Sequence, residues 1–325
     1  MKLRIAFHPL QFQASLAAGG VALMAFNYLQ FAIPHQDGLI TLSNIRWDTL
    51  TGDQRWIGIP LIAILLAFTL VHFLLTAFFT WRLPSWFTVP AGYRGFMADP
   101  YKNVGIFPIV ASLSMTANVF WGPLGFFVPQ VSSNLQALML PSLVFFGLLW
   151  LLLFFLEFKV VKTWLAGEVD KTKFNFVWLL DAFAFGLVSL TGSGVVAITT
   201  NRTIAVLAVV GTIMTLIVGL SLLLYKLVRL ATHHIRAGKL PDNPVLPAFF
   251  LVVPIACLFG LSIYRLAKYA QPYVAFDLGA TQSVVVVASY AITIVWGMAA
   301  VYLIRGYFKS YFVKSQFAPT QWGFV

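Results

Sequence analysis

The chain contains eight long stretches that are almost free of charge, separated by segments that carry most of the charged residues. Each stretch has about 20 residues, enough for a helix to cross a hydrocarbon core ~30 Å thick. Runs of this length favour helices over barrel strands, which alternate over about ten residues. The sequence therefore predicts an all-α, polytopic membrane helix bundle with spans at 12–33, 57–80, 104–128, 138–156, 176–199, 203–225, 245–264 and 281–304.

The overall composition excludes a water-soluble fold of this length. Hydrophobic residues make up 60% of the chain and charged residues 10%, with a mean hydropathy of +0.88. Soluble domains carry roughly a quarter charged residues. Tryptophan and tyrosine stand at many span ends, as in an interfacial aromatic belt. With no soluble domain or low-complexity linker between the spans, residues 1–325 are interpreted as a single membrane domain embedded in the lipid bilayer.

Lys and Arg residues are distributed unevenly between the two sides of the predicted bundle. If the N-terminus is cytoplasmic, 16 of the 21 fall in cytoplasmic segments. This bias predicts a cytoplasmic N-terminus in an inner or plasma membrane. The dispersed basic residues explain the net charge of +11 without a nucleic-acid partner. The five on the opposite side are Arg46, Arg55, Arg202, Arg265 and Lys268.

Glycine and proline favour the odd-numbered spans, whereas the even-numbered spans are mostly runs of Leu, Val and Ile. One interpretation is close helix packing through small residues, which is common in membranes. The other is an inner ring of kinked odd-numbered helices around a pore, with the even-numbered helices outside. Examples are Gly19, Gly20, Pro108, Gly122, Pro123, Gly186, Gly192, Gly194, Pro247, Pro254 and Gly260.

Asp181 is the carboxylate that the predicted boundaries place inside a span, about six residues into span five. An ionised carboxylate costs ~2.5–3.5 kcal/mol at the centre of a membrane helix, so it should face protein, water or a cation. Helical spacing puts Phe185 and Ser189 on the same face. Asp181 is either a proton-titrating or ion-pairing residue at the inner mouth of a pathway, or a structural residue that snorkels or pairs with a loop lysine.

Neutral polar side chains form a second group of pathway candidates. Such donors can replace part of the hydration of an anion without trapping it. Ser112 and Thr116 are four residues apart and share a helical face with Pro108. Taken alone, each residue is better explained as a helix-packing hydroxyl. The group comprises Ser15 and Gln30 in span one, Ser112 and Thr116 in span three, and Ser189 in span five.

The sequence gives no sign of catalytic, cofactor or metal chemistry. There is no Walker motif, dinucleotide fingerprint or HExxH pair. His72 in span two is interpreted as a helix–helix hydrogen-bonding group, and His233-His234 as solvated. The single cysteine, Cys257, excludes an intrachain disulfide and is interpreted as a small buried apolar residue.

Several short motifs resemble the tellurite-resistance/dicarboxylate transporter family, which includes malate and sulfite transporters and slow anion channels. They are His8-Pro9-Leu10-Gln11 continuing to Gly19-Gly20, Asp99-Pro100 leading into Phe107-Pro108, and Lys239-Leu240-Pro241 through Leu246-Pro247-Ala248 to Val253-Pro254. The resemblance implies ten helices in five hairpins around a central pore, commonly as homotrimers. It also implies that odd helices, including the one with Pro254, line the pore and that an aromatic residue of helix nine occludes it.

The chain departs from this pattern at its end, since residues 317–325 resemble only the start of helix nine. Eight of a probable ten spans are therefore present, and Phe324 lies too early to be assigned as the gate. Because the final segment resembles relatives in which a cysteine or selenocysteine follows, we hypothesise a truncation at a selenocysteine codon. The favoured function is an anion channel or transporter for small inorganic anions, sulfite-like oxyanions or C4-dicarboxylates. The alternative is an intramembrane redox protein or enzyme that uses a Cys or selenocysteine just beyond the chain end.

Overall fold

The computed structural model describes residues 7–35, 38–48, 50–89, 92–166, 169–170, 173–314 and 318–324, and these residues contain helices and no strand. Lys2, Arg4, Lys171, Phe317 and Val325, on which parts of the sequence interpretation rest, lie outside them. Eight helical segments are long and apolar enough to span a membrane, which confirms the predicted number. They are Pro9–Ala32, Gly52–Thr88, Asn103–Phe127, Leu135–Leu165, Phe176–Ile198, Arg202–Ala237, Asn243–Tyr273 and Gly279–Phe312.

The main α-helices of the eight spans are joined by short helical turns. The helices are α1 (Phe12–Ala32), α2 (Gly52–Thr88), α4 (Phe107–Val119), α7 (Leu135–Leu165), α8 (Leu180–Ile198), α9 (Arg202–Ala237), α10 (Val252–Ala270) and α11 (Gly279–Tyr307). The short elements used below are η1 (Pro9–Gln11), α3 (Tyr93–Ala98), η3 (Asn103–Ile106), η4 (Phe120–Leu124), α5 (Gly125–Phe127), α6 (Pro129–Ser133), η6 (Phe176–Leu179), η7 (Asn243–Leu251), η8 (Gln271–Tyr273), η9 (Phe308–Phe312) and η10 (Pro319–Phe324). The remaining one is η2 (Leu42–Asn44).

Local sequence signals explain where several helices begin and end. Thr51 and Gln54 form a capping box at the start of α2. Asn201 Oδ1 accepts hydrogen bonds from two backbone amides in the first turn of α9. This helix ends at Gly238, whose φ of 58° is a left-handed conformation that glycine adopts without a Cβ clash. Pro123 lies in a π-helical turn, η4, since proline lacks the N–H that would continue the α-helical pattern.

All four even-numbered spans and span seven are longer than the sequence predicts, with span seven reaching Tyr273 and span eight Phe312. Span two reaches Thr88, span four reaches Leu165 and span six reaches Ala237. The predicted boundaries stopped where the apolar run met a charged residue, whereas a helix continues until its backbone hydrogen bonding is interrupted. The correction matters for the site, because it brings charged residues assigned to loops into the helical spans.

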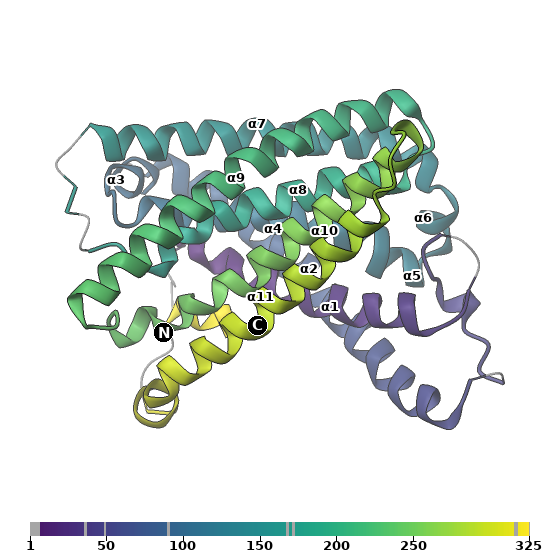
Figure 1. Ribbon diagram of the computed structural model, residues 1–325, viewed down its shortest axis with the longest axis horizontal. Coiled ribbons are helices and arrows are strands. Elements are labelled where there is room, and N and C mark those ends of the chain that lie inside the picture. Colours follow the sequence, from purple (N-terminus) through teal and green to yellow (C-terminus); the bar gives the residue numbers. More distant parts are fainter. Residues whose placement is uncertain are drawn as a thin grey trace.

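The helices fall into a buried and an exposed set. The inner helices α1, α4, α8 and α10 come from the odd-numbered spans, in whose most apolar windows 56% to 100% of the residues are buried. The outer helices α2, α7, α9 and α11 come from the even-numbered spans, with 6% to 33% buried. α10 packs on α8, α8 on α4 and α4 on α1, forming an arc. In Figure 1, α7 runs along the upper edge, and α11 crosses the front diagonally from the upper right to the lower left.

Glycines allow this close packing. A Cβ added to Gly19 would lie 2.5 Å from Met115 of α4 and 2.8 Å from His72 of α2. At Gly192 it would lie 2.7 Å from Phe146 of α7. Small-residue packing and an inner layer of odd-numbered helices, which the sequence left as alternatives, therefore occur together.

Candidate functional site

One buried polar network joins α1, α2 and α4 at their crossing. His72 of α2 is fully buried, with Nδ1 2.7 Å from the carbonyl oxygen of Ser15 and Nε2 3.0 Å from Thr116 Oγ1. Because a carbonyl only accepts, Nδ1 carries the proton at this contact. The hydroxyl oxygens of Ser15 and Ser112 are 2.6 Å apart. The prediction for His72 is confirmed, and Ser15, Ser112 and Thr116 lie in one neutral network.

A second polar network joins α4 to α8. The hydroxyl oxygens of Ser114 and Thr191 are 2.6 Å apart, and Asn118 Nδ2 donates to Thr191 Oγ1 at 2.9 Å. All three side chains are buried. On the other side of α8, Ser189 Oγ donates to Thr215 Oγ1 of α9 at 2.8 Å. Ser189 therefore connects α8 to an outer helix.

A buried ion pair joins α8 to α9. Lys226 Nζ donates to Asp181 Oδ2 and, at 2.9 Å, to the carbonyl oxygen of Trp178. Both charged side chains are fully buried. The ammonium also lies 4.5 Å and 4.6 Å from the ring centroids of Trp164 and Trp178, which supply cation–π contacts. Asp181 is thus buried and ion-paired, and its partner, which the sequence placed in a loop, belongs to α9.

Two ionisable residues of this region were missed by the sequence analysis. Glu157 and Lys226 each follow directly after a predicted span end, at residues 156 and 225, and were therefore assigned to loops. In the structure both lie inside helices, and Glu157 is only 7% exposed. Helical periodicity in the sequence could have identified Lys226 as buried, because Leu223, Lys226 and Leu230 share one buried face of α9.

At the end of the bundle where α8 and η7 begin, inner elements converge on a small crevice. We call this end the basic end. It is the end at which α2, α7 and α9 finish, and it contains Lys102, Lys159 and Lys239. The crevice has a volume of about 10 Å³, roughly that of one water. Gln13 of α1 contributes an amide whose Oε1 is buried without a partner among the described residues. The lining residues are Gln13, Val177, Leu180, Ala248, Leu251, Thr320 and Gly323.

A short C-terminal helix closes this crevice. η10 packs against η7 and touches α1, so it fills the space between the two ends of the inner arc. Thr320 Oγ1 donates to the carbonyl oxygen of Pro244, and Gln321 Nε2 donates to Tyr307 Oη at 2.8 Å. The ring of Phe324 packs against those of Phe250 and Phe308. A crevice of this size is too small for an anion larger than one water.

The other predicted residues lie apart from these contacts. Gln30, at the opposite end of α1, accepts from Ile40 N at 2.8 Å and donates to the Gly38 carbonyl at 2.9 Å, so it holds the loop after α1. Pro108 is buried in the first turn of α4, and Pro254 is half-buried near the start of α10. Phe185 is fully buried against Phe154 of α7.

The prediction that Cys257 is buried is wrong. The residue is exposed, with Sγ 3.2 Å from Thr293 Oγ1 of α11. Its face of α10 points away from α8, so inner helices do not cover it. Among the described residues no three His, Cys, Asp or Glu side chains form a group that could hold a metal ion.

The family model of the voltage-dependent anion channels matches residues 6–325 of the sequence. The chain belongs to this family. The match confirms the resemblance to the tellurite-resistance/dicarboxylate transporters and slow anion channels, since the same family model describes them. Members of the family are channels and transporters rather than enzymes. No curated protein and no solved structure matches the chain significantly.

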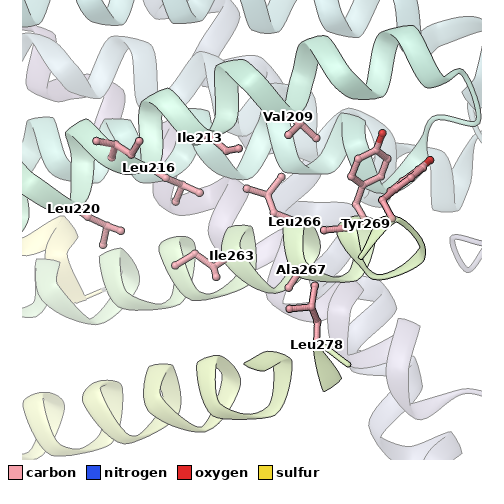
Figure 2. Close-up of a pocket in the computed structure, with 12 residues that line it drawn as sticks. Val209, Ile213, Leu216, Leu220, Ile263, Leu266, Ala267, Tyr269 and Leu278 are labelled. Atoms are coloured by element: carbon pink, nitrogen blue, oxygen red, sulfur yellow. The ribbon is translucent and has the colours of Figure 1, made fainter. Parts of the chain in front are cut away.

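An apolar groove of about 580 Å³ lies between α9 and α10 of this anion channel family member. Figure 2 shows Val209, Ile213, Leu216 and Leu220 along α9, facing Ile263, Leu266 and Ala267 of α10. The lining contains no charged side chain. Because an anion needs charge or hydrogen-bond donors to replace its hydration, this groove is not suited to bind one.

Arg265 of α10 is a half-buried cation that points toward α8. It lies at the end of the bundle opposite the basic end. Its Nη1 lies 3.4 Å from the carbonyl oxygen of Leu190 in α8. A Cβ added to Gly194 would lie 3.6 Å from the same nitrogen. Charge counting from the sequence had assigned Arg265 to an external loop. The structure assigns it to α10, where it is packed against α8.

Proposed function

We propose that this chain moves small inorganic anions across a cell membrane along the axis enclosed by α1, α4, α8 and α10. The family supplies the general activity, anion channel or transporter. The observation that carries the route is the convergence of α1, α8, η7 and η10 on the crevice at Gln13. In this conformation the route is closed, so conduction requires η10 or the inner helices to move.

Charge and hydrogen bonding along the inner helices favour monovalent anions. The polar groups between α1, α4 and α8 are neutral hydroxyls, amides and an imidazole. Arg265 is the cation packed between α10 and α8, whereas the ammonium of Lys226 is already paired with Asp181. A dicarboxylate carries two charges and would call for a second unpaired cation. Chloride and nitrate therefore fit better than sulfite-like oxyanions or C4-dicarboxylates, the other candidate substrates.

Orientation, membrane and assembly complete the proposal. The excess of Lys and Arg at the basic end supports a cytoplasmic location for that end, in an inner or plasma membrane. The resemblance supports a homotrimer, which would cover part of the exposed apolar surface of the outer helices. Cross-linking in native membranes tests this stoichiometry.

Anion flux into liposomes, measured separately for chloride, nitrate, sulfite and malate, tests the proposed function. We expect flux of chloride and nitrate above that of empty liposomes. Arg265→Gln should lower it about tenfold, which corresponds to the loss of about 1.4 kcal/mol of anion stabilisation. Exposed Lys268, one turn further along α10, provides the matched control Lys268→Gln, with near-normal flux. Absence of flux for all four anions would refute the proposal, and flux of malate alone would refute the proposed substrate class.

A further inference from the structure

Glu157 is a buried carboxyl group to which the described residues offer no hydrogen bond. It lies on α7, just before the helix contacts α3 through Lys159 and Thr163. Its side chain is 7% exposed, and neither Oε1 nor Oε2 has a partner among the described residues. A buried, ionised carboxylate without donors is strongly disfavoured, so the charge state of Glu157 needs an explanation.

The surroundings of Glu157 contain one more acid and one base. α8 contributes Asp181 and α9 contributes Lys226. Both helices pack against α7, and the Lys226 ammonium lies 4.5 Å from the ring centroid of Trp164 on α7. α4 has no charged residue, and η3 presents Asn103, a neutral buried amide. On α3, Arg94 is exposed, as is Lys162 on α7 itself.

The remaining nearby cation is directed away from Glu157. Lys159 Nζ donates to Tyr93 Oη at 3.1 Å and lies 4.5 Å from the ring centroid of Phe155. Lys226 already donates to Asp181 and to the Trp178 carbonyl. If all three members of the Glu157–Asp181–Lys226 cluster were ionised, the cluster would therefore hold one uncompensated negative charge.

We propose that Glu157 is a proton-binding site, which holds a neutral carboxylic acid at physiological pH while Asp181 and Lys226 remain an ion pair. The bound proton makes the cluster electrically neutral. An uncompensated buried charge costs several kcal/mol, whereas a neutral carboxyl group costs much less. This proton is bound at the junction of α7, α8 and α9. Its binding does not depend on which anion the chain moves.

The proton links pH to the packing of an inner helix. Loss of the proton would place a second negative charge near Asp181, which is fully buried in the first turn of α8. The junction should therefore weaken as pH rises. The sign follows because the buried junction accommodates a neutral carboxyl group, whereas a further ionised carboxylate without a partner is disfavoured there.

Infrared spectroscopy of the purified full chain in lipid tests the site without any transport measurement. At about pH 7 exposed carboxyl groups are ionised, so we expect one C=O band of a protonated carboxylic acid. The band should shift when the glutamate carboxyl groups carry ¹³C. The sequence has only two glutamates, Glu157 and Glu168, so the band should vanish in Glu157→Gln and persist in Glu168→Gln. A wild-type protein without this band, or a band that ignores the label, overturns the proposal even if the variants fail to fold.

Thermal unfolding between about pH 6 and about pH 9 supplies the second measurement. The unfolding equilibrium constant of the wild type should rise by up to about tenfold per pH unit in this range. Glu157→Gln, which mimics the neutral acid, should remove this dependence. Asp242→Asn, at an exposed carboxylate, should leave it unchanged. Parallel pH profiles for the wild type and Glu157→Gln would contradict the proposal.

Discussion

The inner helix α8 and the outer helix α11 are both apolar spans, but they are in contact with different surroundings. All residues in the most apolar window of the α8 span are buried, compared with 6% for α11. α8 carries Asp181, Ser189, Thr191 and Ser193, all fully buried. α11 packs on α10 and η7, and most of its other residues are exposed.

The difference shows where a membrane protein accommodates polar groups. Lipid offers no hydrogen bonds, so a polar side chain is retained where another helix supplies its partner. Ser189 and Thr191 have such partners on α9 and α4, whereas Ser193 donates to the Leu190 carbonyl within α8. The charge of Asp181 is met by Lys226 from an outer helix. Outer helices also contribute polar groups that point inward, as His72 and Lys226 do.

The largest expected effect comes from removing the inward-pointing charge of an outer helix. Lys226→Met should destabilise the protein by about 3–5 kcal/mol, because Asp181 would remain buried and unpaired. Denaturant unfolding in detergent measures this loss. Lys162→Met, at an exposed position of α7, is the control and should change stability by less than about 0.5 kcal/mol. The double variant Lys226→Met, Asp181→Leu should recover most of the loss. If Lys226→Met is as stable as the wild type, the ion pair does not hold α9 to α8.

Substitution of glycine by alanine makes the same chemical change in an inner and in an outer helix, so it compares their packing. Gly192→Ala on α8 should cost about 1–3 kcal/mol, since the new Cβ would overlap Phe146 and Thr212. Gly147→Ala on α7 meets no atom within 4 Å and should instead stabilise by up to about 1 kcal/mol through helix propensity. The same unfolding assay reads both. Equal effects at the two positions would contradict the distinction between inner and outer packing.

Removing one interhelical hydroxyl should have a smaller effect. Thr191→Val keeps the shape of the side chain but removes its bonds to Ser114 and Asn118 of α4. The expected loss is about 1 kcal/mol, within the range for hydrogen bonds between membrane helices. Ser221→Ala on α9 is the control, since that exposed hydroxyl bonds only to the carbonyl of Ile217 in its own helix. A larger loss for Ser221→Ala would reverse the comparison.

The smallest expected effect is a pH dependence at the start of the first inner helix. His8 Nδ1 accepts a hydrogen bond from Leu10 N at 3.2 Å, which only an unprotonated nitrogen can do. Burial, together with the positive charge of Lys102, lowers the pKa of His8 below its ordinary 6.5. The neutral form is therefore favoured by folding, and the cap is present above pH 6.5 and lost as pH falls through the lowered pKa.

Hydrogen exchange at the first amides of η1 and of α2 measures this effect. Below about pH 6 the Leu10 amide should lose protection by roughly 0.5 kcal/mol, the low end for a helix cap. The Gln54 amide, capped by Thr51, is the control because a hydroxyl does not titrate. His8→Asn should supply a cap that does not depend on pH. Equal pH dependence at both helix starts would contradict the role of His8.

The sequence by itself determined the class of fold, the number of spans and the family. Eight apolar runs of sufficient length, with basic residues concentrated in alternate connections, leave few alternatives to a helical membrane bundle. Glycines and prolines in odd-numbered spans pointed to the helices that pack most closely. These features are local, so they can be read without knowing which helix touches which.

Only the tertiary structure decided which polar residues meet. Asp181 and Lys226 are separated by 45 residues and pair because α8 packs on α9. Ser15, His72 and Thr116 come from three helices and form one network. Hydropathy also ended spans four and six at Glu157 and Lys226, because it measures the preference of a side chain for lipid. Inside a bundle a charged side chain is surrounded by other helices instead. Whether it can be buried depends on the partners that those helices supply.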